Sequence, residues 1–228
     1  MPHRLGLVPA AGSFVQAMRD WTRENDALLL FDEVITFRTE MAGMQARYEV
    51  LPDLTAMGKI IGGGFPVACF GGTKEVMEIE AKNEVMHGGT YTASPLALAA
   101  ADAVLKRIER DKETMYPRLF ELSERLRDGL VRVIRDAGFH CFGQGIGPLF
   151  QVFIGNSDID RLYNYRDTVS YVRDDIFSAF HAELQKRGIY CHPGQFERWF
   201  VSTEHTDQDI DDTIAAADES IRAVAKKF

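Results

Sequence analysis

A continuous apolar run near the start of the chain most constrains how it can fold. Residues 27–31 are Ala-Leu-Leu-Leu-Phe, and the run stops at an acidic pair, Asp32 and Glu33. A short run without polar alternation is typical of a strand that is buried on both faces of a parallel sheet. Residues that follow such a strand lie at its carboxyl end, where open α/β sheets place their ligands. The run therefore predicts an α/β fold with Asp32 at the functional edge of the sheet.

The segments around this run alternate in the order expected for an α/β layer. The spacing of Phe14, Met18 and Trp21 predicts an amphipathic helix over residues 12–25, with Ser13 as its cap. Short strands are predicted for residues 54–57 and 67–70, and a helix for residues 73–81.

The pattern changes at Ser94, where Pro95 suits the first turn of a helix. We interpret residues 1–110 as the C-terminal part of a large α/β domain and residues 111–228 as a small α+β domain. The elements predicted for this region are helices at residues 96–110, 116–137 (ended by Gly138), about 169–187 and from about Asp207, and strands at residues 139–142, 149–154 and 189–192.

Composition excludes several classes of protein. The net charge is −8, from 26 basic and 34 acidic residues, which disfavours a nucleic-acid partner. No apolar run approaches the roughly 20 residues of a membrane helix, and residues 1–10 lack the pattern of a signal peptide. The three cysteines are widely spaced and form no CxxC pair, which is typical of reduced thiols. We expect a cytoplasmic protein.

Lys59 is an unusual residue for its position, because it follows an apolar strand and precedes three glycines, Gly62 to Gly64. Glycines leave the backbone bare, so a bulky group can approach it. An amine in a partly dry site also loses its proton more readily, as Schiff-base chemistry requires. The alternative is a solvated loop lysine. A phosphate loop is absent, and Pro148 replaces the third glycine of a dinucleotide fingerprint at residues 143–148.

Asp32 alone has a plain explanation, since it can cap a turn or pair with Arg38, and Glu33 can support the same turn. Together, Asp32 and Lys59 are more informative. A pyridoxal phosphate enzyme needs an acid beside the pyridine nitrogen and a lysine for the aldehyde, on different strand ends of one sheet. Both residue types follow predicted strands here.

Four segments resemble the class III aminotransferases, and are most similar to glutamate-1-semialdehyde 2,1-aminomutases. They are residues 28–38, 52–66 (ending Met-Gly-Lys-Ile-Ile-Gly-Gly-Gly-Phe-Pro), 88–97 and 193–207. The resemblance implies a pyridoxal phosphate-dependent transferase of fold type I, present here as a partial large domain with a small α+β domain. It also implies pyridoxal 5'-phosphate as the cofactor. No metal site is expected, because the cysteines form no CxxC pair.

The resemblance assigns roles to five residues. Lys59 would hold the cofactor as a Schiff base, Asp32 would keep the pyridine nitrogen protonated, and Val34 would contact the cofactor. Thr90 would donate to the cofactor phosphate of the neighbouring subunit, although a threonine there can also cap a helix. Glu197 would lie near the substrate, although it can also simply cover an aromatic cluster.

The sequence departs from the family in two respects. Family members are about twice as long, and the N-terminal half that supplies the same-subunit phosphate loop and much of the substrate pocket is missing. Strand edges and apolar faces would then be exposed unless another chain, a dimer or aggregation covers them. The glycine that aminomutases usually carry between Thr36 and Phe37 is also missing.

The leading hypothesis is an enzyme that moves an amino group on a small amino acid or a keto or aldehyde acid through Lys59. A homodimer is expected, with a separate N-terminal half chain as another partner. The alternative hypothesis is an inactive truncated homologue that acts as a non-catalytic oligomeric or partner-binding protein. A nucleotide-binding switch is disfavoured, because the sequence contains no phosphate loop.

Overall fold

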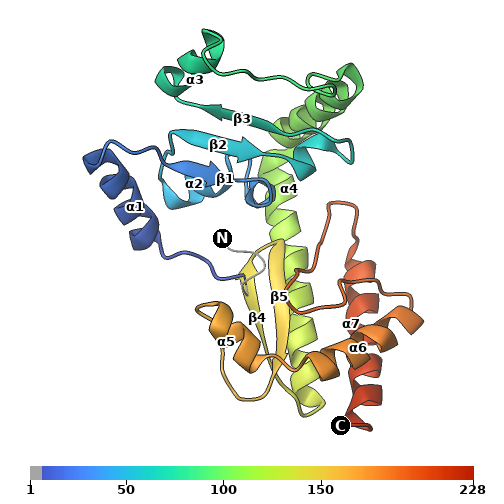
Figure 1. Cartoon of the computed structure of the whole chain (residues 1–228). Coiled ribbons are helices and arrows are strands. Elements are labelled where there is room, and N and C mark those ends of the chain that lie inside the picture. The colour runs from blue at the N-terminus through green and yellow to red at the C-terminus, as the bar shows by residue number, and fades with distance from the viewer. Residues whose placement is uncertain (1–6) are drawn as a thin grey trace. The chain divides into compact units, whose positions relative to one another are not determined.

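The computed structural model describes residues 7–228 and divides into two compact units (Figure 1). We call Ala10–Met115 the sheet unit, and residues 7–9 together with Tyr116–Phe228 the hairpin unit. Their assignment to a large and a small domain remains an expectation. Residues 1–6, where we expect no signal peptide, lie outside the described residues. Within the described residues, no helix is long and apolar enough to cross a membrane.

The sheet unit contains a three-stranded sheet in the order β1-β2-β3 (Figure 1). β1 (Leu30–Asp32) is parallel to β2 (Leu54–Met57), and β2 is antiparallel to β3 (Cys69–Gly72). The strand predicted at residues 54–57 is confirmed. The third strand lies two residues further along than predicted, and its direction makes the sheet mixed rather than parallel.

Five helical segments lie wholly within this unit. The predicted first helix is confirmed, but Ser13 lies inside it and does not cap it, because Ala11 is the N-cap and forms no side-chain bond there. The segments are α1 (Gly12–Glu24), η2 (Thr36–Thr39), α2 (Gly43–Tyr48), η3 (Lys59–Gly62) and α3 (Lys74–Ala81).

The sheet unit has a small core and much exposed apolar surface. Val15, Leu29 and Val50 form its buried cluster. Leu28 and Leu30, on either side of Leu29, are 60% and 54% exposed. The expectation that the apolar run is buried on both faces is therefore wrong for this chain, because successive strand residues point to opposite faces and one face is uncovered.

Helix α1 shows the same one-sided burial. Its inward face contains Val15, Arg19 and Thr22. Phe14, Met18 and Trp21, whose helical spacing predicts the amphipathic helix, are 58%, 42% and 59% exposed. The apolar stripe of α1 therefore lies on its outer face.

Helix α4 (Pro95–Asp136) is a single helix of 42 residues, where we expected two. Pro117 lies inside it and cannot donate a backbone hydrogen bond. The intervening residues 111–115 contain neither glycine nor proline, and Arg107 lies 3.9 Å from Asp111 one turn later. The helix therefore continues, and it ends before Gly138, whose φ is +92°.

The hairpin unit is built on β4 (His140–Ile146) and β5 (Leu149–Gly155), which pair antiparallel. Every residue of β5 is buried. The main core packs against this hairpin and takes residues from α4, α6 (Asp174–Lys186) and α7 (Asp207–Ala225). α7 begins with a capping box formed by Thr206 and Asp209, as expected for a helix from about residue 207.

Two predictions for this unit are wrong. The helix expected at residues 169–187 is two helices, α5 (Tyr165–Tyr171) and α6, because the chain between them pairs with the end of β5. There the amide of Arg173 donates to the carbonyl of Ile154 at 2.9 Å. Residues 189–192 form no strand, since the Ile189 amide donates back to Leu184 at 3.0 Å and so continues the α6 terminus.

Candidate cofactor site at a strand edge

The parallel pair β1 and β2 brings Asp32 and Lys59 to the same edge of the sheet. Asp32 is the last residue of β1 and pairs with Ala56 of β2. Lys59 follows two residues after β2 ends at Met57. Parallel strands have their carboxyl ends at one edge, so both turns belong to it.

The carboxylate of Asp32 has a defined local partner. Its Oδ1 accepts a hydrogen bond from the Val34 amide at 3.0 Å. The same segment is fixed to β2, because the Glu33 amide donates to the Ala56 carbonyl at 2.8 Å. Asp32 is thus both exposed and oriented by its own turn. The turn-capping role proposed as its plain explanation is present in the structure.

Val34 connects the Asp32 turn to the Lys59 turn. A Cβ built on Gly58 would lie 3.6 Å from Cγ1 of Val34, so the valine packs on the backbone just before Lys59. Lys59 itself has a φ of +50°, a left-handed backbone that is uncommon outside glycine. Such conformations gather at functional sites. The Lys59 side chain is exposed, and its amine forms no ion pair within residues 7–228.

Two of the three glycines after Lys59 allow close packing of the backbone against neighbouring side chains, which leaves no open space there for a ligand. A Cβ on Gly62 would lie 2.8 Å from Val67 Cγ1, and one on Gly63 would lie 2.7 Å from Val104 Cγ2 of α4. Gly63 also has a φ of +55°. Only Gly64 has open space around it. The idea that all three leave the backbone open to a bulky group is therefore corrected for Gly62 and Gly63.

Thr90 and Glu197 lie outside the two turns that follow β1 and β2. Thr90 is exposed in the loop before α4 and lies too far from Pro95, the first residue of that helix, to cap it. Glu197 belongs to the hairpin unit. Its backbone carbonyl accepts from the Gln151 side chain of β5, and its carboxylate lies 3.8 Å from Arg198. Neither arrangement tests the role implied for the residue.

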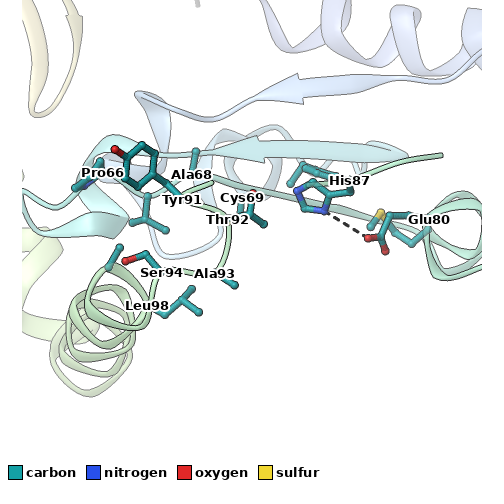
Figure 2. A pocket seen from close by; sticks show the side chains of 14 residues that line it. Pro66, Ala68, Cys69, Glu80, His87, Tyr91, Thr92, Ala93, Ser94 and Leu98 are labelled. Carbon is teal, nitrogen blue, oxygen red and sulfur yellow. Dashed lines mark ion pairs between the residues drawn. The ribbon is translucent and has the colours of Figure 1, made fainter. Parts of the chain in front are cut away.

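A cavity of about 540 Å³ lies elsewhere in the sheet unit, between β3, α3 and the start of α4. Figure 2 shows His87 pointing toward Glu80, and the two lie 3.4 Å apart. Burial raises the pKa of the Cys69 thiol, which also lines the cavity. Sequence analysis did not single out this cavity. None of the predicted site residues lines it, but Ala68 does, and a Cβ built on Gly58 would lie 3.6 Å from that of Ala68.

Comparison with known proteins agrees with the architecture. The family model of aminotransferase class-III matches residues 3–213. The glutamate-1-semialdehyde 2,1-aminomutase of Thermomicrobium roseum is 39% identical over 226 residues, which cover 97% of this chain and 51% of the relative. The corresponding enzyme of Desulforamulus reducens is 39% identical over 227 residues, covering 98% and 51%.

A solved structure gives the same result. The ω-transaminase from Sphaerobacter thermophilus superposes with a TM-score of 0.85 at 33% identity, over 97% of this chain and 50% of that enzyme. The fold is thus that of part of a pyridoxal phosphate-dependent transferase of fold type I, as predicted. The chain belongs to the class III aminotransferases. It spans about half the length of the curated relatives it matches.

Proposed function

We propose that this chain carries the cofactor-anchoring lysine and the ring-nitrogen acid of a pyridoxal phosphate-dependent aminotransferase or aminomutase. The reaction would resemble that of glutamate-1-semialdehyde aminomutase and move an amino group on a small amino acid or a keto or aldehyde acid. The supporting observation is the parallel register that pairs Asp32 with Ala56, because it brings the Lys59 turn to the edge where Asp32 ends its strand.

The residues at this edge suit the cofactor chemically. Among the described residues, the Asp32 carboxylate bonds only to a backbone amide, so it retains acceptor capacity for a protonated ring nitrogen. The exposed Lys59 amine is available to an aldehyde. A carboxylate for the ring nitrogen and an amine for the aldehyde are two of the groups that pyridoxal phosphate requires of a protein.

When bound, pyridoxal phosphate supplies an electron sink for bond breaking at the substrate carbon. Asp32 would hold the proton on the ring nitrogen, because an adjacent carboxylate stabilises the charged form of that nitrogen. The Lys59 amine would anchor the cofactor and move the proton at the substrate α-carbon.

The other three roles are supported mainly by the family. Val34 would contact the cofactor, and its packing against Gly58 beside Lys59 agrees with that role. Thr90 would donate its hydroxyl to the phosphate held by the neighbouring subunit, which requires a homodimer. Glu197 would lie near the substrate.

The exposed apolar surface supports a further partner. Phe14, Met18 and Trp21 share one face of α1 and are all exposed, and the adjoining run exposes Leu28 and Leu30. Surfaces of this kind mark interfaces in soluble proteins. The relatives contain a further half that this chain does not span. A polypeptide equivalent to that half would cover these exposed side chains, as part of the same protein or as a separate chain.

An absorbance titration with pyridoxal phosphate tests the proposal. It is run on the chain alone and on the chain co-expressed with the unmatched half of the Thermomicrobium roseum relative. We expect a shifted visible band that disappears in Lys59→Ala and persists in Lys74→Ala, a control at an exposed lysine of the same unit. A folded complex without the band, or a Lys59→Ala protein that keeps it, would contradict the proposal.

A further inference from the structure

The residue that follows Asp32 in the chain has a buried carboxyl group. Glu33 is 1% exposed, although it follows the exposed end of β1. Its Oε2 accepts from the hydroxyl of Thr36, and its Oε1 accepts from the backbone N–H of Gln45 at 2.9 Å. Burying a carboxyl group is unfavourable unless donors such as these satisfy it. Glu33 therefore joins the start of the loop after β1 to the first turn of α2.

Gly43 closes around the same carboxyl group. A Cβ built on Gly43 would lie 2.6 Å from Glu33 Cδ and 2.7 Å from each carboxyl oxygen. The φ of Gly43 is +68°, which also favours glycine. The backbone comes this near only because Gly43 lacks a side chain. We call Glu33, Thr36, Gly43 and Gln45 the Glu33 clamp.

The clamp acts on Asp32 and Val34, two of the residues expected at the cofactor. The Glu33 amide is fixed to Ala56 of β2, and its side chain is fixed to Thr36 and Gln45. The next amide, that of Val34, holds Oδ1 of Asp32. With the side chain of Glu33 released, the link from this turn to α2 would be lost. The backbone beside Val34 would keep the hydrogen bond from the Glu33 amide to Ala56 and the one from the Phe37 amide to the Glu33 carbonyl, at 3.0 Å. The Asp32 carboxylate would then lose its defined orientation.

We propose that Glu33 is a positioning residue, whose clamp holds the Val34 amide and thereby orients the Asp32 carboxylate toward the proposed cofactor edge. The link to the cofactor rests on the proposed function, whereas the clamp itself is a property of the chain. Glu33 acts through Val34 and Asp32 and touches no reacting atom.

Amide exchange in the cofactor-free chain tests the clamp. In Glu33→Ala, exchange at Val34 and Gln45 should rise at least tenfold, while amides of the hairpin unit keep their rates. Glu33→Gln should stay within threefold of wild type, because its amide oxygen can accept from Gln45 and its NH₂ can donate to Thr36. Glu40→Ala removes an exposed carboxylate from the same loop and serves as the matched control.

Thr36→Val and Gly43→Ala change two other residues of the Glu33 clamp. Thr36→Val removes one donor at nearly constant volume, so it keeps the test decisive if Glu33→Ala fails to fold. Both variants should raise exchange at Val34. Unchanged exchange at Val34 in a folded Glu33→Ala or Thr36→Val protein would overturn the proposal.

Cofactor titration separates this proposal from the proposed function. In a complex that binds pyridoxal phosphate, Glu33→Ala should weaken binding at least tenfold and shift the visible band, whereas Glu33→Gln should do neither. A wild-type complex that binds no cofactor would contradict the proposed function, and amide exchange would then decide the clamp alone. Normal cofactor binding and an unshifted band in a Glu33→Ala complex would overturn the orienting role.

Discussion

The guanidinium of Arg19 lies 2.9 Å from the carboxylate of Asp53, and this ion pair fastens α1 to the entry of β2. The same carboxylate oxygen accepts from the Leu29 amide at 2.7 Å, just before β1 begins. The hydrogen bond from Leu29, followed by the bond from Arg19, lowers the pKa of Asp53 below its usual value despite its partial burial. Asp53 thus joins a helix and both strands that form the candidate site.

The lowered pKa of Asp53 predicts a pH-dependent stability. A depressed folded-state pKa stabilises the protein above the unfolded value of about 3.9, and this stabilisation is lost as the pH falls further. Asp53→Asn should therefore lower the free energy of unfolding by about 1–3 kcal/mol at pH 7. The gap from wild type should close below about pH 4.

Urea unfolding of both proteins from pH 3 to pH 7 measures the gap. Asp20 is an exposed residue of α1, the helix that contains Arg19, and the stability of Asp20→Asn should equal that of wild type at every pH. A gap between wild type and Asp53→Asn that is constant over this range would show that Asp53 does not titrate with a lowered pKa.

The outer face of α1 should matter for association but not for folding. A triple substitution to serine at Phe14, Met18 and Trp21 should change the stability of the chain by no more than about 0.5 kcal/mol per site, because the side chains are exposed. It should reduce binding of an apolar dye and abolish complex formation with the complementary half. Val15→Ser, on the buried face of the same helix, should instead destabilise by about 2 kcal/mol or more.

Thermal unfolding, dye fluorescence and gel filtration distinguish these outcomes. If the triple variant binds the complementary half as tightly as wild type, this face is not the interface. Unchanged complex formation would then direct the search to the exposed residues of β3 and α3.

Gly155, the last residue of β5, should not tolerate a side chain. A Cβ there would overlap the ring of Tyr171, which also contacts the Phe142 ring in a tilted arrangement, with 5.3 Å between ring centroids. Gly155→Ala should cost about 1–3 kcal/mol through overpacking. Gly194→Ala meets only His192 at 3.7 Å and should be close to neutral. Chemical unfolding compares the two, and equal stabilities would contradict the packing described for Tyr171.

The three free cysteines should differ in reactivity. Cys69 is exposed and should react first with a thiol reagent at pH 8. Burial raises the pKa of Cys191 to about 11, so only about one thiol in a thousand is ionised at pH 8. Burial also raises the pKa of Cys141 strongly, so it should react only after unfolding. In Cys69→Ser the fast phase should vanish, and a fast phase that survives would show that a buried thiol is accessible.

Sequence reasoning succeeded where a local signal decides the structure. The strand at residues 54–57, the helix ended by Gly138 and the helix that begins at Asp207 all have such signals. The family could also be recognised, because its motifs follow Asp32 and Lys59 in order. The pairing of Asp32 with Ala56 then follows from two strands of the same direction.

Predictions from the sequence are wrong where contacts between residues distant in the chain determine the structure. The exposure of Leu28 and Leu30 depends on what covers the sheet, which periodicity cannot show. The break between α5 and α6 arises because Arg173 bonds to β5. The Glu33 clamp needs Gly43 and Gln45 brought back against Glu33, and no spacing rule indicates that return.

Borohydride reduction followed by peptide mapping tests the central claim most directly. The protein and its complementary half are incubated with pyridoxal phosphate, reduced and digested. Mass spectrometry then measures the mass of each lysine-containing peptide. The account predicts a reduced cofactor adduct on Lys59, with little on exposed lysines such as Lys74 or Lys82. A folded complex with no adduct on Lys59, or with adducts spread evenly over its lysines, would contradict it.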